Sequence, residues 1–162
     1  MALKHILFLA CVGISVTSGN IVKYEDCGPK GKLATINYVD IKPCKEEPCQ
    51  LVKGQDVSLT IDFTANKRIT EVTAAVYGVI AGTSIPIPHP LPNPNGCKDP
   101  DSGLACPLAA GGSYQYTSTL KVLPIYQLIS LPVKWELKDQ NEDVITCVQV
   151  PVEISGGKKI SG

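Results

Sequence analysis

Residues 84–97 read SIPIPHPLPNPNGC, with five prolines at every second position. Each proline fixes φ at about −65° and removes a backbone N–H donor. The stretch cannot be the interior of a helix or a central strand, and it is predicted to be a stiff, extended, polyproline-like ribbon. Ile85, Ile87 and His89 alternate with the first prolines. A rigid ribbon with this alternation suits the rim of a cavity; the alternative interpretation is a linker between domains.

The sequence on both sides of this ribbon is typical of strands. Val57–Thr64 alternates strictly between apolar and polar residues, so one face should be buried and the other wet. No segment shows a convincing helical period. We therefore predict an all-β, immunoglobulin-like sandwich of about seven antiparallel strands in two sheets. The expected strands are Ile21–Tyr24, Leu33–Ile41, Val57–Thr64, Val72–Ile80, Tyr114–Val122, Ile129–Lys138 and Val144–Ile154.

The first residues have the layout of a secretory signal peptide. Lys4 supplies a positive start, an apolar core follows, and small residues precede position 20. We expect residues 1–19 to be the signal, residues 20–155 a single domain and residues 156–162 a flexible tail. The apolar core is too short to span a bilayer, so a secreted, extracellular product is expected.

Six cysteines follow the expected signal peptide. An even number in a secreted chain indicates disulfides, and several pairings are conceivable in principle. Spacing favours two short bridges across loops that contain proline or glycine, and these would leave a third bridge between the two ends of the domain. The expected pairs are Cys44 with Cys49, Cys97 with Cys106, and Cys27 with Cys147.

The residues that common chemistry needs are scarce. His89 is the only histidine after the expected signal, so a site of several histidines cannot hold a metal ion, and no cofactor fingerprint or nucleophile motif is present. Positive and negative residues balance at 15 each, which gives no electrostatic reason to bind nucleic acid. We expect neither an enzyme nor a bound cofactor or metal.

A β-sandwich with the apolar proline ribbon at its rim can hold an apolar ligand between its sheets. Burying each methylene group gains ~0.8 kcal/mol, so a long alkyl chain or a sterol needs only a dry slot with one or two polar groups at its mouth. The alternative is a core packed solid with side chains, which would make the protein an interaction module without a ligand.

Several short motifs resemble one family throughout the expected domain. They suggest the secreted Niemann-Pick type C2 sterol-carrier family, also known as the ML or lipid-recognition domains, with an arthropod-like character. The motifs are Tyr24-Glu25-Asp26-Cys27-Gly28, Gly78-Val79-Ile80-Ala81-Gly82, Ile85-Pro86-Ile87-Pro88, Asn95-Gly96-Cys97-Lys98, Cys106-Pro107 and Trp135-x-Leu137.

The resemblance implies a lipid tunnel between the two sheets, with the same three disulfides. It also implies a ligand-binding set of Ile87, His89, Val122 and Tyr126 near the mouth and Trp135 deeper inside, to which the alternation of the ribbon adds Ile85. His89 departs from the family, whose vertebrate members usually carry a large aromatic residue there. A polar group at the mouth argues against strict selection of sterols.

Three functions remain open on the sequence. The protein could be a monomeric sterol carrier that docks transiently on a membrane or receptor, a carrier of fatty acids or semiochemicals, or a module that recognises microbial lipid. The chain has no Asn-x-Ser/Thr glycosylation site, whereas glycan-dependent delivery to the lysosomal lumen would need one. An extracellular fluid is therefore the preferred location.

Overall fold

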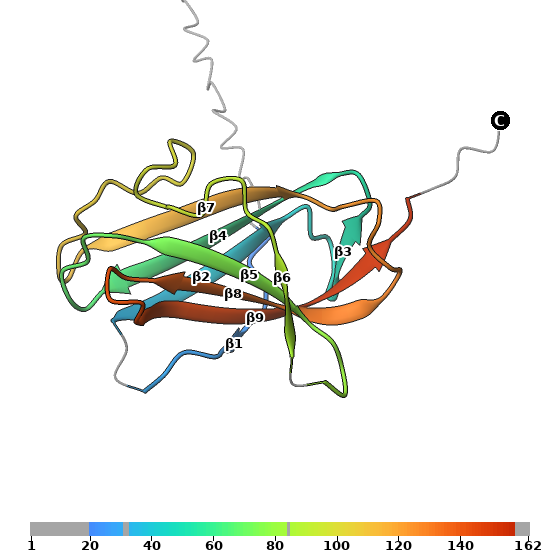
Figure 1. Cartoon of the computed structure of the whole chain (residues 1–162), viewed down its shortest axis with the longest axis horizontal. Helices are drawn as coiled ribbons and strands as arrows, with labels where there is room; N and C mark the ends of the chain where they lie inside the picture. Colours follow the sequence, from blue (N-terminus) through green and yellow to red (C-terminus); the bar gives the residue numbers. More distant parts are fainter. Residues whose placement is uncertain (1–19, 31–32, 84, 158–162) are drawn as a thin grey trace, which may run out of the picture.

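The computed structural model describes residues 20–30, 33–83 and 85–157, which form a sandwich of two β-sheets (Figure 1). The predicted signal peptide and residues 158–162 lie outside these ranges. No helix long and apolar enough to cross a membrane occurs in the part of the chain that the structure describes. The strands are β1 (Glu25–Asp26), β2 (Ala34–Lys42), β3 (Cys49–Val52), β4 (Asp56–Ala65), β5 (Thr73–Val79), β6 (Pro86–His89), β7 (Ser113–Lys121), β8 (Ser130–Lys138) and β9 (Val144–Ser155).

One sheet has three antiparallel strands in the order β2-β4-β7. Its central strand, β4, contains the alternating segment predicted at Val57–Thr64. Ile61 and Phe63 are fully buried, whereas Ser58 and Thr60 are hydrogen-bonded to threonines of β7 on the other face. The alternation of apolar and polar residues along β4 therefore determines which face of this sheet packs against the core.

The other sheet has the order β1-β9-β8-β5-β6, and β3 also pairs with β9. The architecture is as predicted, but three details differ. Two short strands, β3 and β6, were not expected, and β3 runs parallel to β9 rather than antiparallel. The first strand is Glu25–Asp26 instead of Ile21–Tyr24, because in the expected segment only Ile21 makes a bridge, to Asp40.

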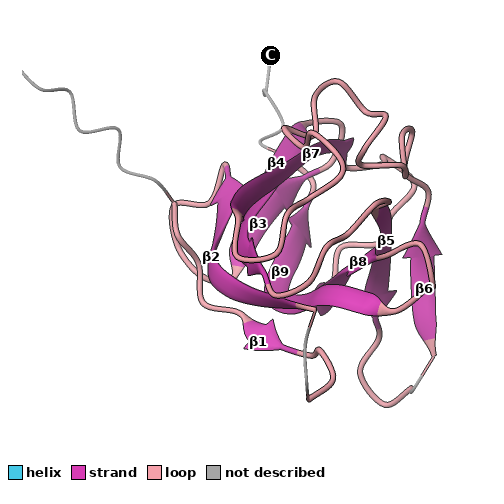
Figure 2. Ribbon diagram, turned by 90° about the vertical axis from the view of Figure 1, so that its left-hand side faces the viewer, coloured by secondary structure: helices cyan, strands magenta, loops and turns pink. Residues whose placement is uncertain are grey.

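The proline ribbon supplies the edge strand of this larger sheet. β6 pairs with β5 on one side only, with Pro86 opposite Val79 and Pro88 opposite Tyr77. A strand that lacks N–H donors at alternate residues can be accommodated at such an edge. Figure 2 shows β6 at the margin of the sheet beside β5.

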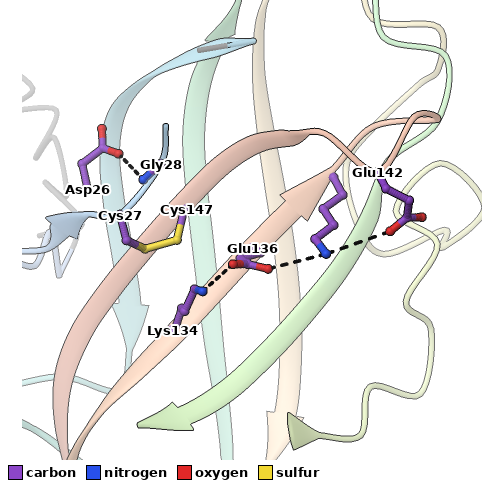
Figure 3. A network of polar contacts seen from close by, with 8 residues as sticks. Asp26, Cys27, Gly28, Lys134, Glu136, Glu142 and Cys147 are labelled. Carbon is purple, nitrogen blue, oxygen red and sulfur yellow. Dashed lines mark hydrogen bonds and ion pairs between the residues drawn. A yellow bond between two sulfur atoms is a disulfide. The ribbon is translucent and has the colours of Figure 1, made fainter. Parts of the chain in front are cut away.

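All three predicted disulfides are present: Cys27–Cys147, Cys44–Cys49 and Cys97–Cys106. Cys147 is opposite Glu136 in the pairing of β8 with β9, so the long-range bridge lies on the outer face of the larger sheet. There Glu136 forms ion pairs with Lys134 at 2.6 Å and with Lys138 at 3.9 Å (Figure 3). This long-range cross-link and these charges therefore lie on the face of the sheet that points away from the core.

The space between the sheets is packed solid at one end. Ile61 and Phe63 of β4 and Tyr116 of β7 are buried there on one side, and Ala74 of β5 and its β8 partner Leu137 on the other. The opposite end of the sandwich, toward the end of β5 and the start of β8, is not filled by side chains.

Candidate functional site: a cavity between the sheets

A cavity of about 390 Å³ occupies that end. Side chains from both sheets and from the connections beside them line it, and nearly all are apolar. The three-stranded sheet contributes Ile41, Val57, Leu59, Leu120 and Lys121, and the larger sheet contributes Leu51, Val76, Tyr77, Gly78, Ile87, Pro88, His89, Leu131, Val133, Trp135, Val148, Val150, Val152 and Ile154; the connections add Ile80, Val122, Ile125, Tyr126, Gln127 and Ile129.

The inner face of the larger sheet is ordered in rows that cross β6, β5, β8 and β9. Residues paired across neighbouring strands point to the same face, so each row places four residues on the cavity side of the sheet. One row is His89, Val76, Trp135 and Val148; the next is Ile87, Gly78, Val133 and Val150.

Gly78 is a gap in the second row. A Cβ atom built there would lie 2.8 Å from Cδ1 of Leu131, which is closer than side-chain carbons approach each other. Leu131 fills the space that this glycine leaves, and both residues line the cavity. The width of the cavity at this point therefore depends on the missing side chain.

Trp135 closes the inner end of the cavity. The residue is 3% exposed, and its ring centroid lies 6.2 Å from that of Tyr116, which belongs to the solid half of the core. Burial raises the pKa of Tyr116, so its phenol stays neutral. An uncharged wall thus separates the cavity from the packed core.

The mouth lies between β6 and the connection from β7 to β8. Val122, only 5% exposed, begins this connection, and Ile125, Tyr126, Gln127 and Ile129 follow along it. Tyr126 faces β6: its Oη is hydrogen-bonded to Nδ1 of His89, and the two ring centroids are 5.7 Å apart. One polar contact therefore joins the two sides of an apolar opening.

Burial favours the neutral form of both members of this pair. Burial lowers the pKa of His89 below its ordinary 6.5, and burial raises the pKa of Tyr126 above its ordinary 10.0. Within the described ranges no group of three or more His, Cys, Asp or Glu side chains could hold a metal ion. The site can bind and orient an apolar molecule, and its chemistry at the mouth is hydrogen bonding.

The structure brings five of the six predicted site residues into the cavity lining: Ile87, His89, Val122, Tyr126 and Trp135. Ile85, the sixth, is 73% exposed and is not part of the lining. The reason is local: β6 begins at Pro86, opposite the last residue of β5, so Ile85 has no neighbour on β5 to pack beside. That these residues bind a ligand remains a prediction.

Most of the lining was not singled out from the sequence. Alternation in Val57–Thr64 and in Ile129–Lys138 identifies Leu59, Leu131 and Val133 as inward-facing residues, but it does not reveal which of them face a cavity and which a packed core. Gly78 gave no signal of a ligand site, because its role depends on the position of Leu131 across the strand pair.

Comparisons with known proteins point to one family. A family model described as the ML domain matches residues 21–154. The chain is 41% identical over 147 residues to a Drosophila melanogaster protein, NPC intracellular cholesterol transporter 2 homolog a, covering 90% of this chain and 95% of that one. It is 38% identical over 150 residues to NPC intracellular cholesterol transporter 2 of Mus musculus, covering 93% and 95%. A crystal structure of a Niemann-Pick type C2 protein from the Japanese carpenter ant superposes with a TM-score of 0.75 at 32% identity, covering 83% of this chain and all of that one.

Proposed function

This chain belongs to the ML-domain family, and on that premise we propose that it is a carrier that holds one small hydrophobic molecule, a sterol or a fatty acid, between its sheets. The observation that carries the proposal is the apolar cavity of about 390 Å³, lined from both sheets. The relatives named as cholesterol transporters support the lipid class of the cargo. We assign no catalytic step to the site.

The energetics suit a carrier. A chain of about a dozen methylene groups would gain roughly 10 kcal/mol on leaving water for such a cavity, before the losses of translational and conformational freedom are subtracted. Because area rather than directed bonds supplies this energy, cargoes of related shape can share the site. The few polar groups at the mouth then orient the cargo.

The three disulfides support an oxidising compartment. We infer that the protein is secreted and works as a monomer in an extracellular fluid. The two sheets of one chain enclose the cavity by themselves, so binding needs no second subunit.

Exposed apolar side chains beside the mouth support delivery at a membrane. Ile85, Ile87, Ile125 and Leu128 are four of the five large apolar residues that stand exposed in the described ranges. Ile87 and Ile125 also line the cavity, and Ile85 and Leu128 lie within two residues of lining positions. We infer that this surface, the apolar lip, contacts a bilayer while cargo passes through the mouth.

Matched substitutions on one ribbon test uptake and delivery separately. Ile87→Glu places a carboxylate in the lining at a residue that is 52% exposed, so the fold should tolerate it, and uptake of cis-parinaric acid and dehydroergosterol should fall by about tenfold or more. Ile85→Glu, outside the lining, should bind both probes as wild type does and should transfer them to phosphatidylcholine vesicles more slowly. Fluorescence titration and transfer kinetics give the two readouts.

Either of two results would contradict the carrier proposal: no uptake of either probe by the wild-type protein, or equal uptake by wild type and Ile87→Glu. Wild-type transfer rates in Ile85→Glu would remove the membrane contact alone.

A further inference from the structure

The cavity has few polar groups, and in the described part of the chain the only polar pair at its mouth, apart from the exposed Gln127, is His89 with Tyr126. Of the described lining residues, Lys121 is the only charged one, and its amine is already 3.2 Å from Asp56. Tyr77 lies under the amine of Lys134, 5.7 Å from the ring centroid. Trp135 Nε1 is enclosed at the inner end. His89 and Tyr126 are half-buried, and their polar atoms meet at the mouth.

The contact between His89 and Tyr126 spans the mouth of the cavity. In the neutral tautomer of His89 that carries its ring proton on Nε2, Tyr126 Oη–H donates to Nδ1. This bond joins the edge strand β6 to the connection between β7 and β8, across the opening. A cargo whose polar end reaches the mouth must therefore compete with an existing hydrogen bond.

The position of His89 favours an end-on cargo. It begins the row that continues through Val76 and Trp135 toward β9. An apolar chain lying along this inner face would have its polar end at the imidazole and its tail against the aliphatic rows. The row is polar at one end and apolar along the rest of its length, as is a long molecule with one polar head group.

Resting on the proposed carrier function, we propose that His89 and Tyr126 form a head-group site that selects cargo ending in a carboxyl group over cargo ending in a hydroxyl group. A carboxylic acid can pass its proton to Nδ1 of His89, which breaks the O–H bond of the acid and forms an N–H bond on the ring. The resulting carboxylate accepts one hydrogen bond from Nδ1–H and a second from Tyr126 Oη–H.

The difference between the two head groups is a matter of counting bonds. The carboxylate replaces the neutral hydrogen bond between His89 and Tyr126 with two bonds, both charge-assisted, and such bonds are about twice as strong as neutral ones. A hydroxyl group has a single oxygen and forms no ion pair, so it roughly exchanges one bond for another. The aliphatic part of the cargo contributes equally in both cases.

A matched pair of ligands tests the selection. Oleic acid and oleyl alcohol, which share one chain, are titrated against N-phenyl-1-naphthylamine bound to the full-length protein. Wild type should prefer the acid by about tenfold or more. His89→Phe should lose most of that preference with little change for the alcohol, and Tyr126→Phe should lose part of it. Asn93→Ala, on the same ribbon but outside the lining, should behave as wild type.

A measurement on the wild-type protein avoids any doubt about folding of the variants. The ring protons of His89, assigned in NMR spectra with the help of His89→Phe, report its titration midpoint. Saturating oleic acid should raise that midpoint, because the carboxylate favours the charged ring, whereas oleyl alcohol should leave it unchanged. Lys121→Gln tests the remaining cation of the lining and should keep the preference for the acid.

The outcomes separate this inference from the carrier function. If both ligands displace the probe but His89→Phe weakens both alike, or Lys121→Gln removes the preference instead, the head-group site is refuted and the carrier function stands. An unchanged titration midpoint of His89 with the acid also refutes the site. If neither ligand displaces the probe, the head-group site is refuted, and the uptake of dehydroergosterol then decides the carrier function.

Discussion

His89 brings an imidazole ring to a mouth whose other side chains, apart from Tyr126 and Gln127, are aliphatic. Two prolines flank it, and its neighbours on the ribbon alternate between the cavity side and the outer side. Burial favours the neutral ring, so the proton-binding properties of His89 differ between the folded and the unfolded chain. The protonation of His89 therefore makes the free energy of unfolding depend on pH.

This dependence predicts how stability responds to acid in the absence of lipid. Because the pKa of His89 is lowered in the folded protein, the unfolded chain binds the proton more tightly. The stability that the folded protein gains from burying the neutral His89 ring is fully present above pH 6.5. It is lost as the pH falls through 6.5 toward the pKa of His89 in the folded protein. Urea unfolding between pH 7.5 and pH 5 should show a steeper loss of unfolding free energy for wild type than for His89→Gln. Parallel profiles would mean that the ring is solvated in the folded protein.

At the scale of elements, β5 and β8 set the width of the cavity. Gly78→Ala would place a Cβ 2.8 Å from Leu131 Cδ1, so the end of Leu131 must turn, and since it lines the cavity the turn takes up cavity volume. The rigid ring system of dehydroergosterol should lose several-fold more affinity than the flexible chain of cis-parinaric acid, with a loss of unfolding free energy of about 1–3 kcal/mol. Titrating both probes measures the difference.

The control for Gly78→Ala is Val79→Ile, which also adds one carbon to β5 but on the opposite face of the strand. Val79→Ile lies outside the lining and should bind both probes as wild type does. If Gly78→Ala weakens the two probes equally, or neither, the contact between Gly78 and Leu131 does not limit the width of the site.

The elements also show how far the sequence leads. β4 and β8 could be predicted because each packs one apolar face against the other sheet, and alternation records that burial. β3 could not, because its pairing with β9 joins residues about a hundred positions apart and leaves no local pattern. The ribbon was correctly expected to be extended and not central, yet its pairing with β5 depends on where β5 ends. The same boundary explains why Ile85 falls outside the cavity.

The site, like the strands, could be predicted where local sequence patterns determine it and not where long-range packing does. Ile87, His89 and Tyr126 were identified from the ribbon and from the resemblance, and the structure brings all three to the mouth. The division of the core into a packed end and a hollow end could not be predicted. Both ends contain the same kinds of inward-facing aliphatic residue, and only the packing between the sheets distinguishes Val133 from Leu137.

At the scale of the whole molecule, the sandwich combines a packed half that supplies stability with a hollow half that accepts cargo. The long-range disulfide and the ion pairs of Glu136 lie on the outer face of the larger sheet, so they hold its strands together without occupying the interior. The hollow half is bounded by edge strand β6 and by the connection between β7 and β8, the two segments joined through His89 and Tyr126. Opening the mouth therefore need not disturb the packed half.

The central claim is that one lipid molecule lies between the two sheets, and intermolecular nuclear Overhauser effects from a bound fatty acid to protein methyl groups test it most directly. The account predicts contacts from a single ligand molecule to methyls of both sheets at once, Leu59 and Leu120 on one side and Val76, Val133 and Val150 on the other. Leu137 and Ile61, in the packed half, should show none. Contacts confined to the exposed side chains of Ile85, Ile125 and Leu128 would instead place the lipid on the surface and contradict the account.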